Sequence, residues 1–148
     1  MSAVVIGVGN RWRRDDAAGL AVLAALRGRV DESVRLVESD GEPTRLLGAF
    51  ELGEQIVMVD AVVTGAAPGT VHRVTDTELP DQMGIGQSSH LVQLVETIEL
   101  GKLLGHLRNG LVLIGIEATD FDHGEGMTDA VAGAIGLAVE AVLRELQG

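Results

Sequence analysis

Residues 3–19 read AVVIGVGNRWRRDDAAG: a short apolar run, a glycine-containing loop and the start of a helical pattern. Apolar runs of this kind, rich in Val and Ile and bounded by Gly, Asp or Asn, predict buried strands. They cover residues 3–8, 34–38, 55–60, 70–74 and 111–116. Helical patterns lie between them, at 16–28, near 43–51, at 89–105 and at 127–146. This alternation predicts an α/β protein with a mostly parallel sheet.

The connection between the third and fourth predicted strands is short. Only nine residues, 61–69, separate these strands, whereas a parallel crossover needs a dozen or more. We therefore expect a five-stranded sheet with one antiparallel strand, the fourth, and helices on both faces. The Gly-Ala-Ala-Pro-Gly run at 65–69 predicts a turn, and no linker or repeat divides the chain. Residues 1–148 are expected to form a single domain.

The composition limits the partners and the compartment. A chain of 148 residues with 46% hydrophobic content fits one ordinary core. Its formal net charge of -11 repels a phosphate backbone, so nucleic acid is not an expected partner. No apolar stretch approaches the ~20 residues of a transmembrane helix, and the N-terminus lacks a signal-peptide pattern. These two features predict no membrane partner. The chain also has no cysteine, which suits a reducing compartment, so we expect a cytoplasmic protein.

Three residues are expected to meet at one edge of the sheet. In an open α/β sheet, ligands bind outside the carboxyl ends of the parallel strands. Asp16 opens the helix after the first strand, Asp60 ends the third strand, and His90 opens the helix that leads to the fifth. A helix N-terminus favours the carboxylate of Asp16 and disfavours a charged His90. Two carboxylates and a neutral imidazole suit a divalent metal such as nickel, zinc or cadmium.

Each of these residues also has a purely structural interpretation. In that alternative, Asp16 serves only the helix dipole, and Asp15 is the N-cap beside it. Asp60 simply ends a strand and begins a turn, and His90 is an ordinary residue at a helix entry. Only the predicted convergence of the three at one edge favours a metal site.

The glycine-rich opening does not predict a nucleotide site. The dinucleotide fingerprint is G-x-G-x-x-G, and Trp12 stands at its third glycine position. Asp15 and Asp16 would also repel a pyrophosphate at the helix N-terminus.

A second acidic cluster follows the fifth predicted strand. Its metal-capable side chains are Asp120, Asp122, His123 and Glu125. The cluster lacks the EF-hand spacing, so we interpret it as a solvated loop, with a contribution to the rim of the site as the alternative. His72 and His106 have no spacing that suggests a role.

A set of motifs follows in order along nearly the whole chain. They are GVGN at 7–10, DD at 15–16 with Gly19, DG at 40–41, VDAV at 59–62, PGTVHR at 68–73, SSH at 88–90 with Leu94, and GIE at 115–117. Together they resemble the hydrogenase maturation endopeptidases of the nickel-iron enzymes. The resemblance implies a phosphorylase/hydrolase-like fold and a metal bound by Asp16, Asp60 and His90.

The resemblance also implies an activity and a partner. The partner is the precursor of the nickel-iron hydrogenase large subunit, whose C-terminal peptide is removed after nickel has been inserted. Nickel then arrives with the substrate and the protein holds no permanent cofactor, although cadmium or zinc can substitute in crystals. Two chemistries stay open: the metal is a Lewis acid for the carbonyl or water, or Asp16 or Asp60 is the general base of an aspartic-type mechanism.

The resemblance implies that the loop after the second predicted strand contacts the substrate. Asp40 and Gly41 begin the loop that reads the substrate in this family, although Glu42 and Pro43 replace the usual glycine and threonine. Ala17 likewise replaces the glycine that usually follows the acidic pair.

The run Arg11, Trp12, Arg13 and Arg14 is expected to grip the precursor or its tail, because Trp and Arg most often anchor interfaces. The alternative is a charged surface loop with Trp12 folded onto the core.

Two rival functions follow from other classes of protein. The first is a nickel-dependent chaperone or binding module that binds the large subunit without cutting it. The second is a different hydrolase such as a peptidyl-tRNA hydrolase, whose opening GLGN loop is similar. That enzyme needs a basic groove and a catalytic histidine near the first loop, and this sequence has neither.

Overall fold

The computed structural model describes residues 2–79 and 89–148, apart from the side chains of Ser89 and His90. Its strands are β1 (Ala3–Val8), β2 (Val34–Ser39), β3 (Gln55–Val62), β4 (Val71–Thr75) and β5 (Val112–Glu117). In the part of the chain described, they form one five-stranded sheet in the order β2-β1-β3-β5-β4. β4 pairs antiparallel with β5 and the other pairs are parallel, so the predicted mixed sheet is confirmed.

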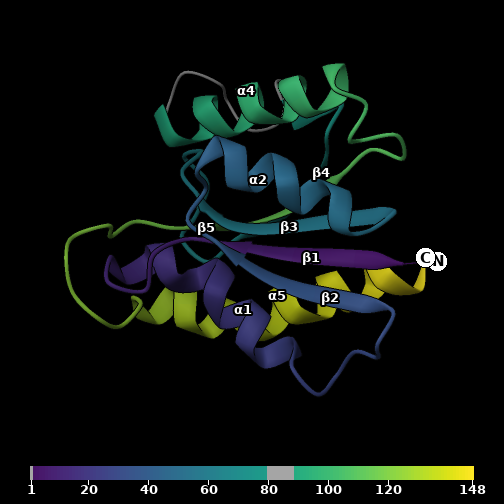
Figure 1. The fold of residues 1–148 in the computed structure, drawn as a ribbon. Helices are drawn as coiled ribbons and strands as arrows, with labels where there is room; N and C mark the ends of the chain where they lie inside the picture. The colour runs from purple at the N-terminus through teal and green to yellow at the C-terminus, as the bar shows by residue number, and fades with distance from the viewer. Residues whose placement is uncertain (1, 80–88) are drawn as a thin grey trace.

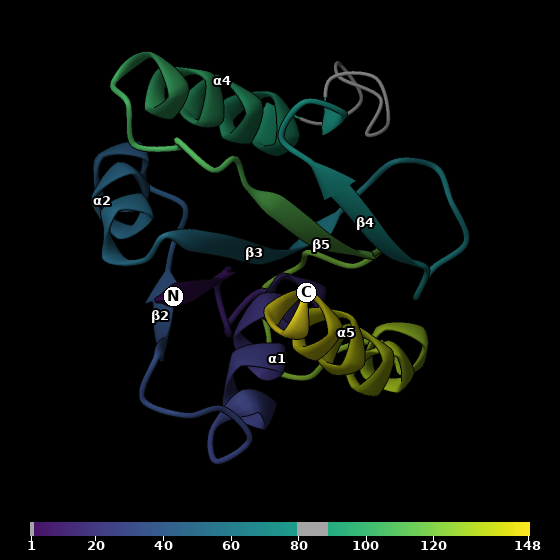
Figure 2. The same cartoon turned by 90° about the vertical axis from the view of Figure 1, so that its right-hand side faces the viewer.

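Helices cover both faces of the sheet, as the sequence predicts. They are α1 (Ala18–Leu26), α2 (Pro43–Ala49), α4 (Ser89–Leu103) and α5 (Asp129–Gln147). Figure 1 shows α2 and α4 on one face and α1 and α5 on the other, and Figure 2 shows the same layers end on. None of the described helices is both long and apolar enough to cross a bilayer.

The core has one layer on each side of the sheet, because side chains alternate along each strand. On β3, Met58 and Val62 pack toward α2 and α4, whereas Val57, Val59 and Ala61 pack toward α1 and α5. β1 is buried along its whole length, which explains its uninterrupted apolar sequence.

The predicted helix at 16–28 is divided into two parts. A 3-10 turn, η1 (Arg14–Ala17), precedes α1, and a second 3-10 turn, η2 (Phe50–Leu52), extends α2. α1 ends at Leu26, two residues before Gly28, which has a φ of 84°. The chain leaves the helix at Arg27, which is extended with a ψ of 129°, so the helix ends earlier than the apolar pattern suggests, and Gly28 adopts its left-handed conformation at little cost in the turn that follows.

Candidate active site

The loop after β1 folds back onto the end of its own strand. The backbone N–H of Asn10 donates to the carbonyl of Asp16 at 3.2 Å. Gly9 has a φ of 154°, and a Cβ atom there would lie only 1.9 Å from that same carbonyl oxygen. No residue with a side chain fits at Gly9. The backbone of Asp16 is therefore held against the carboxyl end of β1.

Gly19 brings α1 close to the backbones of β1 and β3. A Cβ atom at Gly19 would lie 2.4 Å from the carbonyl oxygen of Val59 and 2.5 Å from that of Val8. Val59 immediately precedes Asp60 in β3. The start of α1, with η1 before it, thus lies against the end of β1 and against the part of β3 that leads into Asp60, and Asp16 and Asp60 belong to neighbouring segments.

Asp60 is fully buried inside β3 rather than at its end. The sequence prediction placed the end of the strand at this residue, and that boundary is wrong by two residues. β3 continues because Ala61 and Val62 still pair with Ile116 and Glu117 of β5. Alternation along the strand places Asp60 on the side of the sheet that α2 and α4 cover.

His90 lies in the first turn of α4, which covers that same side of the sheet. Its side chain lies outside the described residues, so the mutual geometry of Asp16, Asp60 and His90 is a prediction here. Among the side chains that the structure describes, a set that excludes His90, no group of three or more His, Cys, Asp and Glu residues has the geometry of a metal site.

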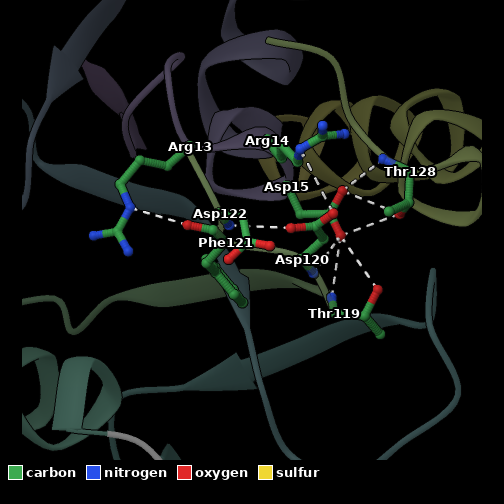
Figure 3. Close-up of polar contacts among 8 residues, drawn as sticks. All are labelled: Arg13, Arg14, Asp15, Thr119, Asp120, Phe121, Asp122 and Thr128. Atoms are coloured by element: carbon green, nitrogen blue, oxygen red, sulfur yellow. Dashed lines mark hydrogen bonds and ion pairs between the residues drawn. The ribbon is translucent and has the colours of Figure 1, made fainter. Parts of the chain in front are cut away.

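Asp15 is fully buried, and its carboxylate accepts hydrogen bonds from the segment after β5. The donors are the backbone N–H groups of Thr119 (3.1 Å), Asp120 (3.0 Å) and Thr128 (2.7 Å), and the hydroxyl of Thr128 at 3.0 Å (Figure 3). Burial raises the pKa of Asp15, but these hydrogen bonds outweigh it and hold the pKa below its ordinary value of 3.8.

The alternative interpretation of Asp15 as the N-cap of its own helix is wrong. The residue before η1 is Arg13, and it makes no side-chain cap. Asp15 instead binds donors that lie 104 to 113 positions away in the sequence. One of these residues, Thr128, is the N-cap position of α5, so Asp15 joins the start of α5 to the segment that carries Asp16.

The loop at 118–128 is attached to the first loop along its length. The N–H of Arg14 donates to the carbonyl of Gly124, and the N–H of Gly124 donates to the carbonyl of Trp12 at 2.8 Å. The Nε of Arg13 donates to the carbonyl of Phe121 at 3.1 Å (Figure 3). The acidic side chains of this loop are largely exposed, as the solvated-loop interpretation predicts, but its backbone supports the segment that carries Asp16.

Arg14 has a left-handed backbone with a φ of 46°, the one non-glycine residue with positive φ among those described. This conformation costs free energy in a residue with a Cβ atom. The hydrogen bond to Gly124 and an ion pair with Asp120 at 3.7 Å hold it in place. Arg13 and Arg14 therefore bind this loop of the same molecule.

A cleft of about 500 Å³ opens between the first loop and the loop after β2. Its lining residues are Gly9, Asn10, Arg11, Trp12, Leu20, Val37, Glu38, Ser39, Asp40, Arg45, Ala49 and Leu52. Trp12 is 55% exposed, so the alternative in which it folds onto the core is wrong. Among its lining residues, ion pairs bind Arg11 to Glu38 at 3.0 Å and Arg45 to Asp40 at 2.8 Å. The cleft combines apolar surface with charges of both signs.

Glu117, the last residue of β5, forms a polar network that the sequence analysis missed. Its buried carboxylate accepts hydrogen bonds from the N–H of Thr64 (2.8 Å), the hydroxyl of Thr64 (2.6 Å) and the N–H of Gly65 (3.3 Å). The Nε2 of His72 lies 3.0 Å from the same carboxylate. Burial raises the pKa of Glu117, and these bonds more than offset it, so the pKa is lowered from its ordinary value. The position of Glu117 at a strand end was the available signal.

Comparisons with known proteins agree with this architecture. The family model of hydrogenase maturation proteases matches residues 21–145. The chain belongs to the hydrogenase maturation protease family. The hydrogenase 2 maturation protease of Escherichia coli is 28% identical over 99% of this chain and 92% of its own length. The hydrogenase expression/formation protein HupD of Rhodobacter capsulatus is 29% identical over 97% of this chain and 70% of its own length.

A solved structure shows the same fold. The hydrogenase maturating endopeptidase HybD from E. coli superimposes with a TM-score of 0.86 at 27% identity, over 99% of this chain and 93% of that one. As a member of this family, the chain is a protease of hydrogenase maturation.

The departures of this hydrogenase maturation protease from the expected family pattern have local explanations. Ala17 has a φ of -80° and a ψ of -4°, which any residue adopts, so glycine is not needed there. Glu42 is the N-cap of α2 and accepts from the N–H groups of Thr44 and Arg45, and Pro43 occupies the first helical turn. Both residues favour a helix start at this point.

Proposed function

We propose that this protease removes the C-terminal peptide of a nickel-iron hydrogenase large-subunit precursor and recognises the nickel already bound in that substrate. In this proposal Asp16 and Asp60 offer carboxylate oxygens, and His90 offers an imidazole nitrogen, to nickel that belongs to the substrate. Ligands of these types suit a divalent metal of borderline hardness. The reaction is hydrolysis of the peptide bond near the metal.

One observation carries the proposal: the segments of Asp16 and Asp60 are neighbours at the carboxyl edge of the sheet, the edge where open α/β sheets bind ligands. The start of α4, where His90 lies, is on the same side of the sheet as Asp60. The buried position of Asp60 excludes bulk water from its carboxylate, which strengthens its attraction for a cation.

The cleft between the first two loops supports a site for the precursor chain beside the metal. Arg11, Trp12 and Asp40 line it, and Gly41 follows directly. An exposed Trp with a neighbouring Arg is a common anchor in protein interfaces. We assign substrate contact to these residues and a supporting role to Arg13 and Arg14, which bind the loop at 118–128. We place the reaction in the cytoplasm, a reducing compartment that suits a chain without cysteine.

The decisive experiment incubates the purified protein with the large-subunit precursor from the same organism, loaded with nickel or free of it, and measures the mass of the substrate. We expect loss of a C-terminal peptide only from the nickel-loaded form. Equal cleavage of the nickel-free precursor would reject nickel recognition and favour an aspartic-type mechanism. Stable binding without a change in mass would support a non-cleaving chaperone.

A pair of variants tests the site. Asp60→Asn removes one proposed metal ligand and is expected to slow cleavage by at least about 100-fold. Asp122→Asn is the matched control, because Asp122 is exposed in the loop at 118–128 and lies outside the proposed site. Equal rates for the two variants would reject the role of Asp60.

A further inference from the structure

Glu117 and His72 lie on the same face of the sheet as Asp60. In the strand register, Asp60 of β3 pairs with Gly115 of β5, and Gly115 pairs with His72 of β4. β5 lies between the other two strands (Figure 2). His72 shares its side of β4 with Val74, which packs in the same core layer as Met58, so His72 and Asp60 face the same way.

Gly115 contributes no side chain between these two residues. Neighbouring strands lie about 4.8 Å apart, so roughly 10 Å separates the Cα atoms of Asp60 and His72. A peptide group of a substrate bound at Asp60 is therefore within reach of the imidazole of His72 on β4, two strands away from β3.

Glu117 orients the ring of His72. The side chain of Glu117 is 2% exposed and that of His72 is 20% exposed, with Nε2 and Oε1 3.0 Å apart. The N–H groups of Thr64 and Gly65 donate to the other oxygen of the carboxylate, Oε2, and the hydroxyl of Thr64 donates to Oε1. A fixed carboxylate that binds one ring nitrogen sets the orientation of an imidazole, which is the arrangement found in catalytic acid–base histidines.

Peptide hydrolysis needs such a group. The amine leaves poorly unless its nitrogen receives a proton as the C–N bond breaks. In the proposed function, Asp16, Asp60 and His90 contact the metal, and their ligating atoms are not free to carry that proton. Among the described side chains, His72 is the imidazole held by a carboxylate on the sheet face of Asp60.

We propose that His72, oriented by Glu117, carries a proton from the attacking water to the departing amine. The inference rests on the proposed function. Neutral His72 accepts a proton from water as the water oxygen bonds to the carbonyl carbon. The C–N bond then breaks, its electron pair passes to nitrogen, and that nitrogen receives the proton from His72. The products are a carboxylic acid and an amine, and the imidazole returns to its neutral form.

The test compares His72→Gln with the natural protein in single-turnover cleavage of two nickel-loaded precursors. One carries the natural amide at the cleaved bond, and the other, made by protein ligation, carries an ester there. An alkoxide leaves without full protonation, so it needs less proton transfer than an amine. We expect the amide rate to fall about 100-fold and the ester rate about 10-fold or less, with precursor affinity unchanged.

The control is His106→Gln. His106 is as exposed as His72, with a side chain 21% exposed and 3.3 Å from the carboxylate of Glu51, but Glu51 is 60% exposed, and His106 precedes β5 and so lies at the opposite edge of the sheet. We expect both of its cleavage rates to match the natural protein. If His72→Gln fails to fold, Glu117→Gln replaces it, and we expect a fall of about 10-fold for the amide with a smaller fall for the ester.

The outcomes separate this inference from the proposed function. Equal losses on amide and ester, or no loss on either, would overturn the proton-transfer role while leaving the protease activity established. A natural protein that cleaves neither nickel-loaded precursor would overturn the proposed function and the inference with it.

Discussion

Replacing Asp15 with alanine removes the acceptor that joins the first loop to the segment after β5. Three backbone N–H groups, those of Thr119, Asp120 and Thr128, lose their partner in partly buried surroundings. An unsatisfied buried donor costs about 1–3 kcal/mol, and partial contact with water favours the lower end. We expect Asp15→Ala to lower the free energy of unfolding by about 3–4 kcal/mol. For a chain of this size, that corresponds to a fall in Tm of roughly 10 °C.

The same reasoning gives a dependence on pH. Hydrogen bonds hold the pKa of Asp15 below 3.8, so the folded protein keeps the carboxylate ionised where the unfolded chain would bind a proton. The stability from these bonds is complete above pH 3.8 and is lost as the pH falls through the lower folded value. Asp15→Asn should remove this part of the loss of stability at acidic pH, because an amide side chain binds no proton in that range.

Urea unfolding followed by circular dichroism, at neutral pH and at a series of acidic values, measures both effects. Asp122→Ala in the attached loop is the control, and we expect it to leave stability unchanged because its side chain is exposed. A loss below about 1 kcal/mol for Asp15→Ala would refute the reasoning, since it would mean that water replaces the carboxylate without cost.

Three further predictions concern backbone contacts and the cleft. Gly19→Ala should destabilise the protein by at least about 2 kcal/mol in urea unfolding, since the added Cβ would lie 2.4 Å from the carbonyl oxygen of Val59. Gly48→Ala, which has open space around it in α2, should instead stabilise the protein by about 0.5–1 kcal/mol. A reversed order of the two stabilities would contradict both expectations. Trp12→Ala should weaken precursor binding about tenfold in calorimetry and change stability by less than about 0.5 kcal/mol, and unchanged affinity would remove Trp12 from the substrate site. Arg14→Gly should raise Tm slightly, because glycine adopts a φ of 46° without strain; a marked fall would show that the contacts of the Arg14 side chain outweigh that strain.

Local sequence patterns were sufficient for the elements and for much of their arrangement. The predicted strand at 3–8 is confirmed residue for residue as β1. A strand that is buried on both faces is apolar at every position, so the apolar run marks both of its ends. The short connection after β3 correctly predicted an antiparallel β4, because chain length alone forbids a parallel crossover. The strand-edge rule also selected Asp16 and Asp60, whose segments the fold makes neighbours.

Only the tertiary structure decided which polar groups meet. The donors to Asp15 lie 104 to 113 positions away, and Glu117 binds His72 from 45 positions away. No local window contains both partners of such a bond, because each partner is chosen by the crossing of strands and loops that the whole core holds in place. For the same reason the sequence placed the end of β3 at Asp60: the last two pairs of that strand exist only because β5 lies beside it.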